Sequence, residues 1–383
     1  MTDFETIIDF GSNNIKLGIF NKESKNIYSS EQKIFDNGEK SLNNLIKNAE
    51  KFLSKHIDDV VVLYDTPKFY PLDLSIKKVF DNEISIKKVY ANLIEEAHFF
   101  ISQNNFKDQI IHSVVNNIVV DESKNLTQIT EDIKIKSLIL EIKFICLNKI
   151  LIDDISSIFK RNNLKILNLY CSSYVKSLNY KNKFEDKDYI IFLDIGYERT
   201  TGLIFNNYKF DFFKSIPLGG NNITKDISKV LKLNLDYSED LKIKFNKEEN
   251  EKSFNKIDSN VINPYSEILE KNISIDLLKQ IIKARVDEIM ELVVFQSNYF
   301  KNLNTTEKPK LIIIGGGSQL LYNNYTLNIK KLVSELKIFN EFDSNVCLAG
   351  FNYHQSDESF LTKNKKKVKK LGFFETFFNI FSK

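Results

Sequence analysis

Two stretches decide the fold of this chain: IIDFGSNNIKLGIF at residues 7–20 and FLDIGYERTTGLIF at residues 192–205. Each reads as an apolar strand that ends in an Asp-x-Gly turn and is followed by a second apolar strand. When the two stretches are aligned, Asp9 falls on Asp194, and the glycine of one turn falls on the glycine of the other. The repeat predicts two β-hairpins of one design, in the two halves of a duplicated α/β chain.

The two turns have the chemistry of a phosphate-binding site. Glycine lets a turn approach a phosphate, and consecutive backbone N–H groups with a hydroxyl such as Ser12 or Thr200 supply hydrogen-bond donors. Asp9 and Asp194, at the strand ends, could hold Mg²⁺ through water molecules. A single turn of this kind would be an ordinary hairpin turn, which is common. Two of them, together with a third glycine turn, favour nucleotide binding.

The third turn lies in LIIIGGGSQL at residues 311–320, between a buried strand and an expected helix start at Ser318. Glycines before a helix N-terminus suit the ribose and α-phosphate of a nucleotide, although such turns serve packing as often. The sequence lacks GxxxxGK[ST], which excludes a P-loop protein. It also lacks the acidic residue expected about 20 positions after a Rossmann turn, which excludes NAD binding.

Arg285 and Glu288 lie one helical turn apart in RVDEIMEL, residues 285–292. A guanidinium can stack on a purine, and a carboxylate can accept hydrogen bonds from ribose hydroxyls. The same spacing also fits a surface ion pair within one helix. Both interpretations stay open.

The composition excludes several classes of protein. The chain has 383 residues, 42% hydrophobic and 27% charged, so it can bury a core, and two or more domains are expected. Its three cysteines form no CxxC pair and its four histidines show no HxxH or HExxH spacing, which argues against a disulfide framework, a zinc site and a metallohydrolase. No apolar run of about 18 residues appears, which excludes a membrane-spanning helix. The N-terminal sequence lacks the features of a signal peptide, so we expect a cytoplasmic location.

The positive charge is concentrated at the C-terminus. Residues 363–383 hold seven lysines and one acidic residue, so the rest of the chain is mildly acidic. Such a body is a poor nucleic-acid binder, because neutralising phosphates requires a basic face. We therefore expect no nucleic-acid partner.

The last residues, LGFFETFFNIFSK at 371–383, have the periodicity of an amphipathic helix with an aromatic face. A lysine cluster before such a face is typical of a helix that lies in the interface of a bilayer with anionic lipid. The alternatives are a helix docked on the protein's own core and a basic nuclear or nucleic-acid tail. The pattern favours the membrane. The predicted membrane-binding residues are Lys369, Lys370, Leu371, Phe373, Phe374, Phe377, Phe378 and Phe381.

Other periodicities predict the remaining elements. Residues 242–264 are polar and read as a loop or an irregular region. The stretch 84–161 has strands and helices of its own and predicts an inserted subdomain. The expected strands are 60–64, 110–120, 133–145, 166–170 and 310–314, and the expected helices are 84–100, 151–161 and 277–300.

The two hairpins, the strand–GGG turn and the insertion resemble the actin/Hsp70 ATPase superfamily, and more narrowly the FtsA-type bacterial cell division proteins. The most specific segment is IPLGGNNITKDISKVLKLNLDYSEDLKIKF at residues 216–245; ISIKKVYANLIEEAHFF at 84–100 and RVDEIMEL are also similar to segments of that family. The resemblance implies an α/β, actin-like duplicated ATPase fold with the FtsA-type inserted subdomain, called 1C, and a C-terminal amphipathic helix. The implied organisation is subdomain 1A at 1–82 and 163–188, 1C at 83–162, 2A at 189–232 and 303–355, 2B at 233–302, a basic linker at 356–370 and a membrane-targeting helix at 371–383.

The resemblance also implies a function. FtsA-type proteins bind ATP, anchor the ring of the tubulin-like GTPase FtsZ to the cytoplasmic face of the cell membrane at the division septum, and help to assemble the divisome. The implied partners are the FtsZ C-terminal peptide, further copies of the chain in filaments, anionic lipid and other divisome proteins. ATP controls polymerisation in this family, and no residue stands out as a hydrolytic base, so we expect little or no hydrolysis.

The cofactors expected are ATP and Mg²⁺, with Asp9 and Asp194 orienting the metal through water. The residues predicted to bind them are Asp9, Gly11, Ser12, Asn13, Asn14, Lys16, Asp194, Gly196, Tyr197, Thr200, Gly219, Gly220, Arg285, Glu288, Gly315, Gly316 and Gly317.

The second turn departs from the family pattern, which usually reads DIGGGTT. Here Tyr197 and Glu198 replace two glycines. Glu198 should weaken phosphate binding unless it turns outward or joins the Mg²⁺ shell.

Two other functions stay open. One is a type IV pilus assembly adaptor of the FtsA-like group, which should lack the phenylalanine-rich tail. The other is a sugar or acetate kinase on the same scaffold, for which we find neither a catalytic base nor a polar sugar pocket.

Overall fold

The structure is a computed structural model. It describes residues 4–34, 38–104, 107–126, 128–129, 131–184, 189–207, 209–245, 275–296, 308–318, 333–339 and 343–356. Half of the predicted subdomain 2B, the linker at 356–370 apart from Ser356, and the predicted membrane helix with its phenylalanines and lysines lie outside these residues. None of the helices described is both long and apolar enough to cross a membrane.

The first sheet has the strand order β3-β2-β1-β4-β9. Strands β1 and β2 form the predicted antiparallel hairpin, and β3 pairs antiparallel with β2. On the other side, β4 pairs in parallel with β1, and β9 pairs in parallel with β4. Apolar side chains from one face of this sheet pack with the helices α1 (Glu39–Leu53) and α3 (Lys149–Arg161). The strands are β1 (Phe4–Phe10), β2 (Asn14–Asn21), β3 (Asn26–Lys33), β4 (Asp59–Tyr64) and β9 (Lys165–Cys171).

The second sheet repeats the first, with the order β12-β11-β10-β13-β14. Here too the hairpin is antiparallel and the next two strands are parallel to it. The repeated order confirms the duplicated α/β design, and it places the end of β1 and the end of β10 in equivalent positions. The strands are β10 (Tyr189–Ile195), β11 (Thr200–Asn206), β12 (Lys209–Ile216), β13 (Lys310–Ile314) and β14 (Glu335–Ile338).

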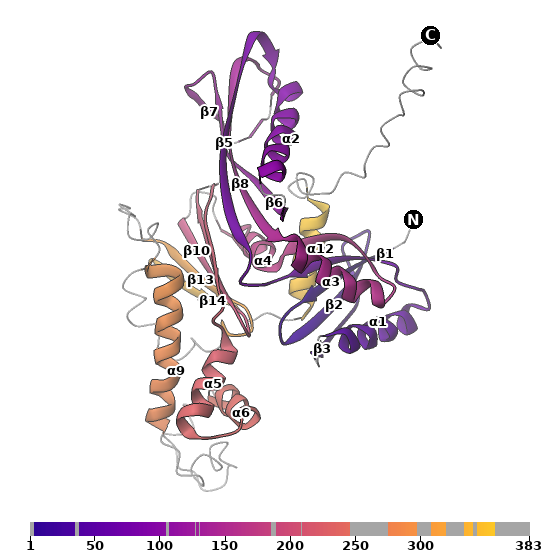
Figure 1. Ribbon diagram of the computed structural model, residues 1–383, viewed down its shortest axis with the longest axis vertical. Coiled ribbons are helices and arrows are strands. Elements are labelled where there is room, and N and C mark those ends of the chain that lie inside the picture. The colour runs from indigo at the N-terminus through magenta and orange to yellow at the C-terminus, as the bar shows by residue number, and fades with distance from the viewer. Residues whose placement is uncertain are drawn as a thin grey trace.

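A third sheet, β5-β8-β6-β7, forms the insertion and is covered by one helix, α2 (Ile86–Asn104). It projects at the top of the molecule, opposite α5 (Gly220–Leu231), α6 (Leu235–Phe245) and α9 (Ile275–Met290) (Figure 1). The strands are β5 (Tyr70–Ser85), β6 (Asp108–Val120), β7 (Lys124–Leu126) and β8 (Lys134–Asn148).

The insertion differs from the predicted limits 83–162 at both ends. It begins earlier, because β5 pairs with β8 over most of its length from Tyr70 onward, and this long strand was not expected. It ends earlier, because α3 buries Ile155 and Phe159 in the core of the first sheet. The side chain of Asn148 accepts a hydrogen bond from the backbone N–H of Ile150 at 3.0 Å, so α3 starts directly at the end of β8.

Helix α12 (Asp343–Gln355) corrects the predicted limits of subdomain 2A. The sequence placed it with the second sheet, but it packs on the first. Its Phe351 ring stacks on Phe20 of β2 at a centroid distance of 5.0 Å, and a Cβ added at Gly18 would lie 2.6 Å from Cβ of Cys347. Position along the chain therefore does not say which sheet a helix covers.

The predicted helix 277–300 is shorter and less regular than expected. Helix α9 ends at Met290 and continues as a π-helical turn, η1 (Glu291–Phe295). Val293 of η1 lies directly over Gly202 of β11, where an added Cβ would come within 2.3 Å of its Cγ1. The widened turn thus lies against the strand where that strand carries no side chain.

Candidate functional site

Three turns meet around one cavity of about 420 Å³. Because β1 and β4 run parallel, as do β10 and β13, the turns that follow β1, β10 and β13 lie at the carboxyl ends of their strands. Ligands bind at this edge in open α/β sheets. The predicted residues that line the cavity are Asp9, Gly11, Ser12, Asn13, Asn14, Lys16, Asp194, Gly196, Tyr197, Gly220, Gly315, Gly316 and Gly317.

The first turn is closed by its own backbone. The N–H of Gly11 donates to the carbonyl of Asn14 at 3.2 Å, and a Cβ at Gly11 would lie 2.9 Å from that oxygen. The side chain of Asn14 donates to Glu31. Oδ1 of Asp9 accepts a hydrogen bond from the hydroxyl of Ser172 at 2.8 Å. The turn is therefore held in shape while Ser12 and Asn13 line the cavity.

The second turn has the same closure, with the N–H of Gly196 donating to the carbonyl of Arg199 at 2.8 Å. The predicted ligands Thr200 and Gly219 do not line the cavity. The Thr200 hydroxyl donates to the carbonyl of Leu218 at 2.7 Å, and a Cβ at Gly219 would lie 2.6 Å from the carbonyl oxygen of Gly196. Both residues thus pack against the backbone around the second turn, away from the cavity.

The third turn depends on glycine. Gly315 has φ +91°, and a Cβ there would lie 2.4 Å from Oδ1 of Asp194. The N–H of Gly317 donates to the carbonyl of Ile195 at 2.8 Å. The strand–GGG turn therefore lies directly on the second turn, and an L side chain at Gly315 would be strained and would clash.

A cluster of buried charges lies at the base of the cavity. Oδ2 of Asp194 is 2.8 Å from Nζ of Lys176 and 2.8 Å from Nη2 of Arg199, and Arg199 also pairs with Asp65. Burial alone would raise the pKa of Asp194, but Arg199 and Lys176 hold that pKa well below its ordinary value. Burial raises the pKa of Asp65 despite the adjacent guanidinium. The cluster joins the two halves, since Asp65 follows β4 and Arg199 precedes β11.

Most of this cluster was missed from the sequence. Asp65 could have been found, because it ends an apolar strand in VVLYDTP just as Asp9 and Asp194 end theirs. Lys176 and Ser173 lie in α4 (Ser172–Lys181), whose start follows β9 without a loop, and neither was assigned to the site from the sequence. The hydroxyl of Ser173 donates to Oδ2 of Asp194 at 2.6 Å, and its oxygen lies 3.1 Å from both carboxylate oxygens of Asp65.

Lys242 of α6 is a second buried lysine of the cavity that was not predicted. Its Nζ donates to the carbonyl of Gly220 at 3.1 Å and to Glu239 at 2.6 Å. Burial lowers its pKa, against the effect of Glu239. The ammonium group lies 5.9 Å from the ring centroid of Tyr197, within the range of a cation–π contact. Tyr197, which stands where the family pattern has a glycine, is thus in contact with a buried lysine of the cavity.

Arg285 and Glu288 lie outside the lining of the cavity. Arg285 makes a bidentate pair with Asp226, at 2.7 Å from Nε and 3.0 Å from Nη2, and its Nη1 is 2.5 Å from Glu288. Of the two interpretations of Arg285 and Glu288, a nucleotide contact and an ion pair within one helix, the structure shows the ion pair. Asp226 was missed, since nothing in the sequence connects it with a helix about 60 residues further on.

Glu198 is exposed and is not among the residues that line the cavity. Its carboxylate therefore turns outward, which was one of the two arrangements compatible with phosphate binding.

The fit of the site to Mg²⁺ is uneven. Asp9 lines the cavity, but Oδ2 of Asp194 already accepts from Ser173, Lys176 and Arg199. Its Oδ1 is buried and has no hydrogen-bond partner among the residues described. Within those residues, no group of three or more His, Cys, Asp or Glu side chains is arranged to hold a metal ion. Asp194 therefore does not fit the role of a magnesium ligand.

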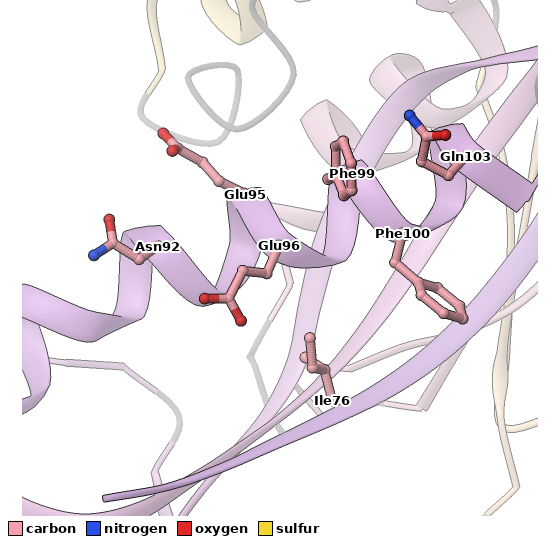
Figure 2. A pocket seen from close by; sticks show the side chains of 7 residues that line it. All are labelled: Ile76, Asn92, Glu95, Glu96, Phe99, Phe100 and Gln103. Atoms are coloured by element: carbon pink, nitrogen blue, oxygen red, sulfur yellow. The ribbon is translucent and has the colours of Figure 1, made fainter.

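A wider hollow of about 640 Å³ lies on the insertion and holds none of the predicted nucleotide ligands. It is lined by Ile76 of β5 and by side chains of α2, among them the exposed rings of Phe99 and Phe100 (Figure 2). We assign the site to the smaller cavity, because the three glycine turns and the buried charges converge there.

Comparisons with known proteins agree with this architecture. The family model of the cell division protein FtsA matches residues 191–351. The cell division protein FtsA of Bacillus subtilis (strain 168) is 24% identical over 216 residues, which cover 55% of this chain and 47% of that protein. The chain thus spans about half the length of this curated relative.

Two solved structures are similar over most of the chain. One is a chain of the PilM-PilN type IV pilus biogenesis complex, with 14% identity, a TM-score of 0.59, and coverage of 90% of this chain and 97% of that chain. The other is MreB 5 of Spiroplasma citri bound to AMPPNP, with 11% identity, a TM-score of 0.45, and coverage of 93% and 96%. The match to the FtsA model confirms the resemblance stated from the sequence, and the likeness to the PilM-PilN chain confirms the actin-like fold.

Proposed function

We propose that this chain is an actin-like, ATP-binding cell division protein that tethers the FtsZ ring to the cytoplasmic face of the cell membrane. One observation carries the nucleotide part of the proposal. The two equivalent Asp-x-Gly turns and the strand–GGG turn, which are far apart in the sequence, all face one cavity. The match of residues 191–351 to FtsA supports the division part.

The residues present fit a nucleotide. The backbone N–H groups around Ser12 and Asn13, together with Lys16, would hold phosphates, and Gly315, Gly316 and Gly317 would pass under the adenosine. A bound triphosphate would supply negative charge shared by both halves of the chain, so its presence would favour one arrangement of the two halves. The acidic side chains of the cavity are hydrogen-bonded or ion-paired, and we propose that the chain hydrolyses ATP slowly or not at all.

Gly316 offers a direct test of the cavity. It lines the cavity, is exposed, and a Cβ added there meets no atom within 4 Å. Gly316→Leu should therefore fill the cavity while leaving the fold intact, and Gly316→Ala should have a smaller effect. We expect ATP to raise the Tm of the wild type and not that of Gly316→Leu. An equal shift in both proteins would refute the assignment of this cavity.

The tethering part rests on the sequence of residues 363–383. These residues would bind anionic lipid through their lysines and phenylalanines, while the rest of the chain would bind the FtsZ C-terminal peptide, other divisome proteins and further copies of itself in filaments. This arrangement would place the protein at the division septum.

Vesicle sedimentation tests the tether. Deleting 363–383 should abolish co-sedimentation with vesicles of anionic lipid. A variant with Phe373, Phe377 and Phe378 changed to Ser keeps every lysine, so it separates apolar insertion from charge. We expect it to sediment much less than the wild type. Sedimentation of the deletion variant at the wild-type level would refute the tether.

Binding of an FtsZ C-terminal peptide tests the partner. The protein on an anionic lipid monolayer with ATP should retain the labelled peptide and form filaments. ATP binding without retention of the peptide would refute the FtsZ tether and favour the pilus assembly adaptor. Transfer of phosphate from ATP to sugars or acetate would instead favour a kinase.

A further inference from the structure

Two fixed cations lie beside the second turn, where a nucleotide site commonly has a metal ion. Nζ of Lys176 and Nη2 of Arg199 are each 2.8 Å from Oδ2 of Asp194. The hydroxyl of Ser173 donates to the same oxygen at 2.6 Å. This oxygen therefore accepts three hydrogen bonds, two of them from charged groups, and has no capacity left for a metal-bound water.

The other oxygen of Asp194 is closed off as well. Oδ1 is buried without a hydrogen-bond partner in the part of the chain that the structure describes. The backbone of Gly315 lies over it, so closely that a Cβ would be 2.4 Å away. Oδ1 thus lies packed against the third turn and accepts no hydrogen bond from the residues described. Asp194 thus balances the two cations rather than offering a ligand.

The two cations come from separate elements and are held in place. Arg199 belongs to the second turn itself, where its carbonyl accepts from Gly196 and its Nη1 donates to the carbonyl of Asp194 at 2.9 Å. Lys176 comes from α4. Both residues line the cavity, and their side chains are about nine-tenths buried. Asp9 is then the strand-end carboxylate left to face a metal. The second carboxylate of the buried cluster, Asp65, is also taken up, because it pairs with Arg199.

We propose that Lys176 and Arg199 occupy the carboxylate that would otherwise hold a divalent cation at the second turn, so that the chain binds an adenine nucleotide without Mg²⁺. The inference rests on the proposed nucleotide binding and goes beyond it. The guanidinium and ammonium groups donate to Asp194 directly, so this carboxylate is satisfied without a hydrated ion. The predicted role of Asp194 as a metal ligand is replaced by a role in holding the two cations.

Calorimetric titration of the full chain with ATP tests this inference, once in excess Mg²⁺ and once in EDTA. The wild type should show dissociation constants that agree within about threefold, because no metal contributes to the site. A loss of affinity of about tenfold or more in EDTA would overturn the inference while leaving nucleotide binding intact. No binding in either buffer would refute the proposed nucleotide site, and this inference with it.

A matched pair of lysine variants adds a second measurement. Lys176→Met removes one of the two cations beside Asp194, and Lys242→Met removes a buried lysine of the same cavity that does not contact Asp194. In Lys176→Met we expect affinity in EDTA to fall about tenfold and Mg²⁺ to restore part of it, while Lys242→Met should bind equally in both buffers. If the two variants responded alike to Mg²⁺, the specific role of Lys176 would be refuted. Circular dichroism confirms that each variant is folded, and the comparison of buffers in the wild type does not depend on either variant.

Discussion

Lowering the pH from about 7.5 to about 4.5 should destabilise this protein through one buried histidine, His112 of β6. The imidazole is fully buried. Its Nε2 accepts from the backbone N–H of Cys171 at 2.8 Å, and its Nδ1 lies 2.9 Å from the hydroxyl of Tyr353 on α12. The neutral ring satisfies both contacts. A protonated ring would place a second donor against the N–H of Cys171 and a charge among the rings of Tyr170 and Tyr174.

The sign and size of the effect follow from the pKa. Burial lowers the pKa of His112 from 6.5 to about 3. Between these values the unfolded chain binds one proton more than the folded chain, so stability is full above the unfolded pKa and falls as the pH decreases. The slope approaches about 1.4 kcal/mol per pH unit, and the loss between pH 7.5 and pH 4.5 is roughly 3 kcal/mol.

Urea unfolding followed by circular dichroism measures this loss, since the chain has no tryptophan. His112→Phe should be less stable at pH 7.5 by roughly 2–4 kcal/mol, because the N–H of Cys171 and the hydroxyl of Tyr353 lose their partner. The difference between the wild type and this variant should then shrink by roughly 3 kcal/mol at pH 4.5.

A control variant separates titration from the loss of a hydrogen bond. Tyr353→Phe removes one contact worth about 1 kcal/mol but keeps the buried imidazole, so its stability should depend on pH as that of the wild type does. If the wild type and His112→Phe gave parallel curves from pH 7.5 to pH 4.5, the reasoning from burial would be wrong.

Four further substitutions test the packing and the edges of the site. Gly202→Ala should cost about 1–3 kcal/mol in the free energy of unfolding, because its Cβ would lie 2.3 Å from Cγ1 of Val293; an unchanged Tm would contradict this contact. Gly315→Ala should cost more, roughly 2–4 kcal/mol, and abolish the Tm shift with ATP, because it combines a positive φ with a clash; a wild-type response to ATP would speak against the third turn. Arg285→Ala should cost at most about 1 kcal/mol in urea unfolding and leave ATP affinity unchanged, while a clear loss of affinity would show that its helix contacts the nucleotide. Glu198→Gln should change ATP affinity by less than about twofold in calorimetry, because the carboxylate is exposed; a larger gain would place it beside the phosphates.

Local sequence was enough to predict the turns and most of the strands. The alternation of apolar residues before Asp9 and Asp194 is a property of neighbouring residues, and a strand followed by Asp-x-Gly has few other local solutions. The duplication was visible for the same reason, since one pattern occurs twice. Together these features predicted two sheets. With the strand–GGG turn and the family resemblance, which supplied Gly220, the sequence predicted thirteen of the residues that line the cavity.

Tertiary structure decided which chemistry the cavity contains. Lys176, Arg199 and Asp65 come from a helix, a turn and a strand end, and only the packing of the two halves brings their charges into one buried cluster. The same packing decided that α12 covers the first sheet and that Oδ1 of Asp194 lies under Gly315. The periodicity of a segment reports which of its faces is apolar, but not which surface that face meets. Electrostatic pairing and burial depend on distances between segments remote in sequence, so they arise only when the chain is folded.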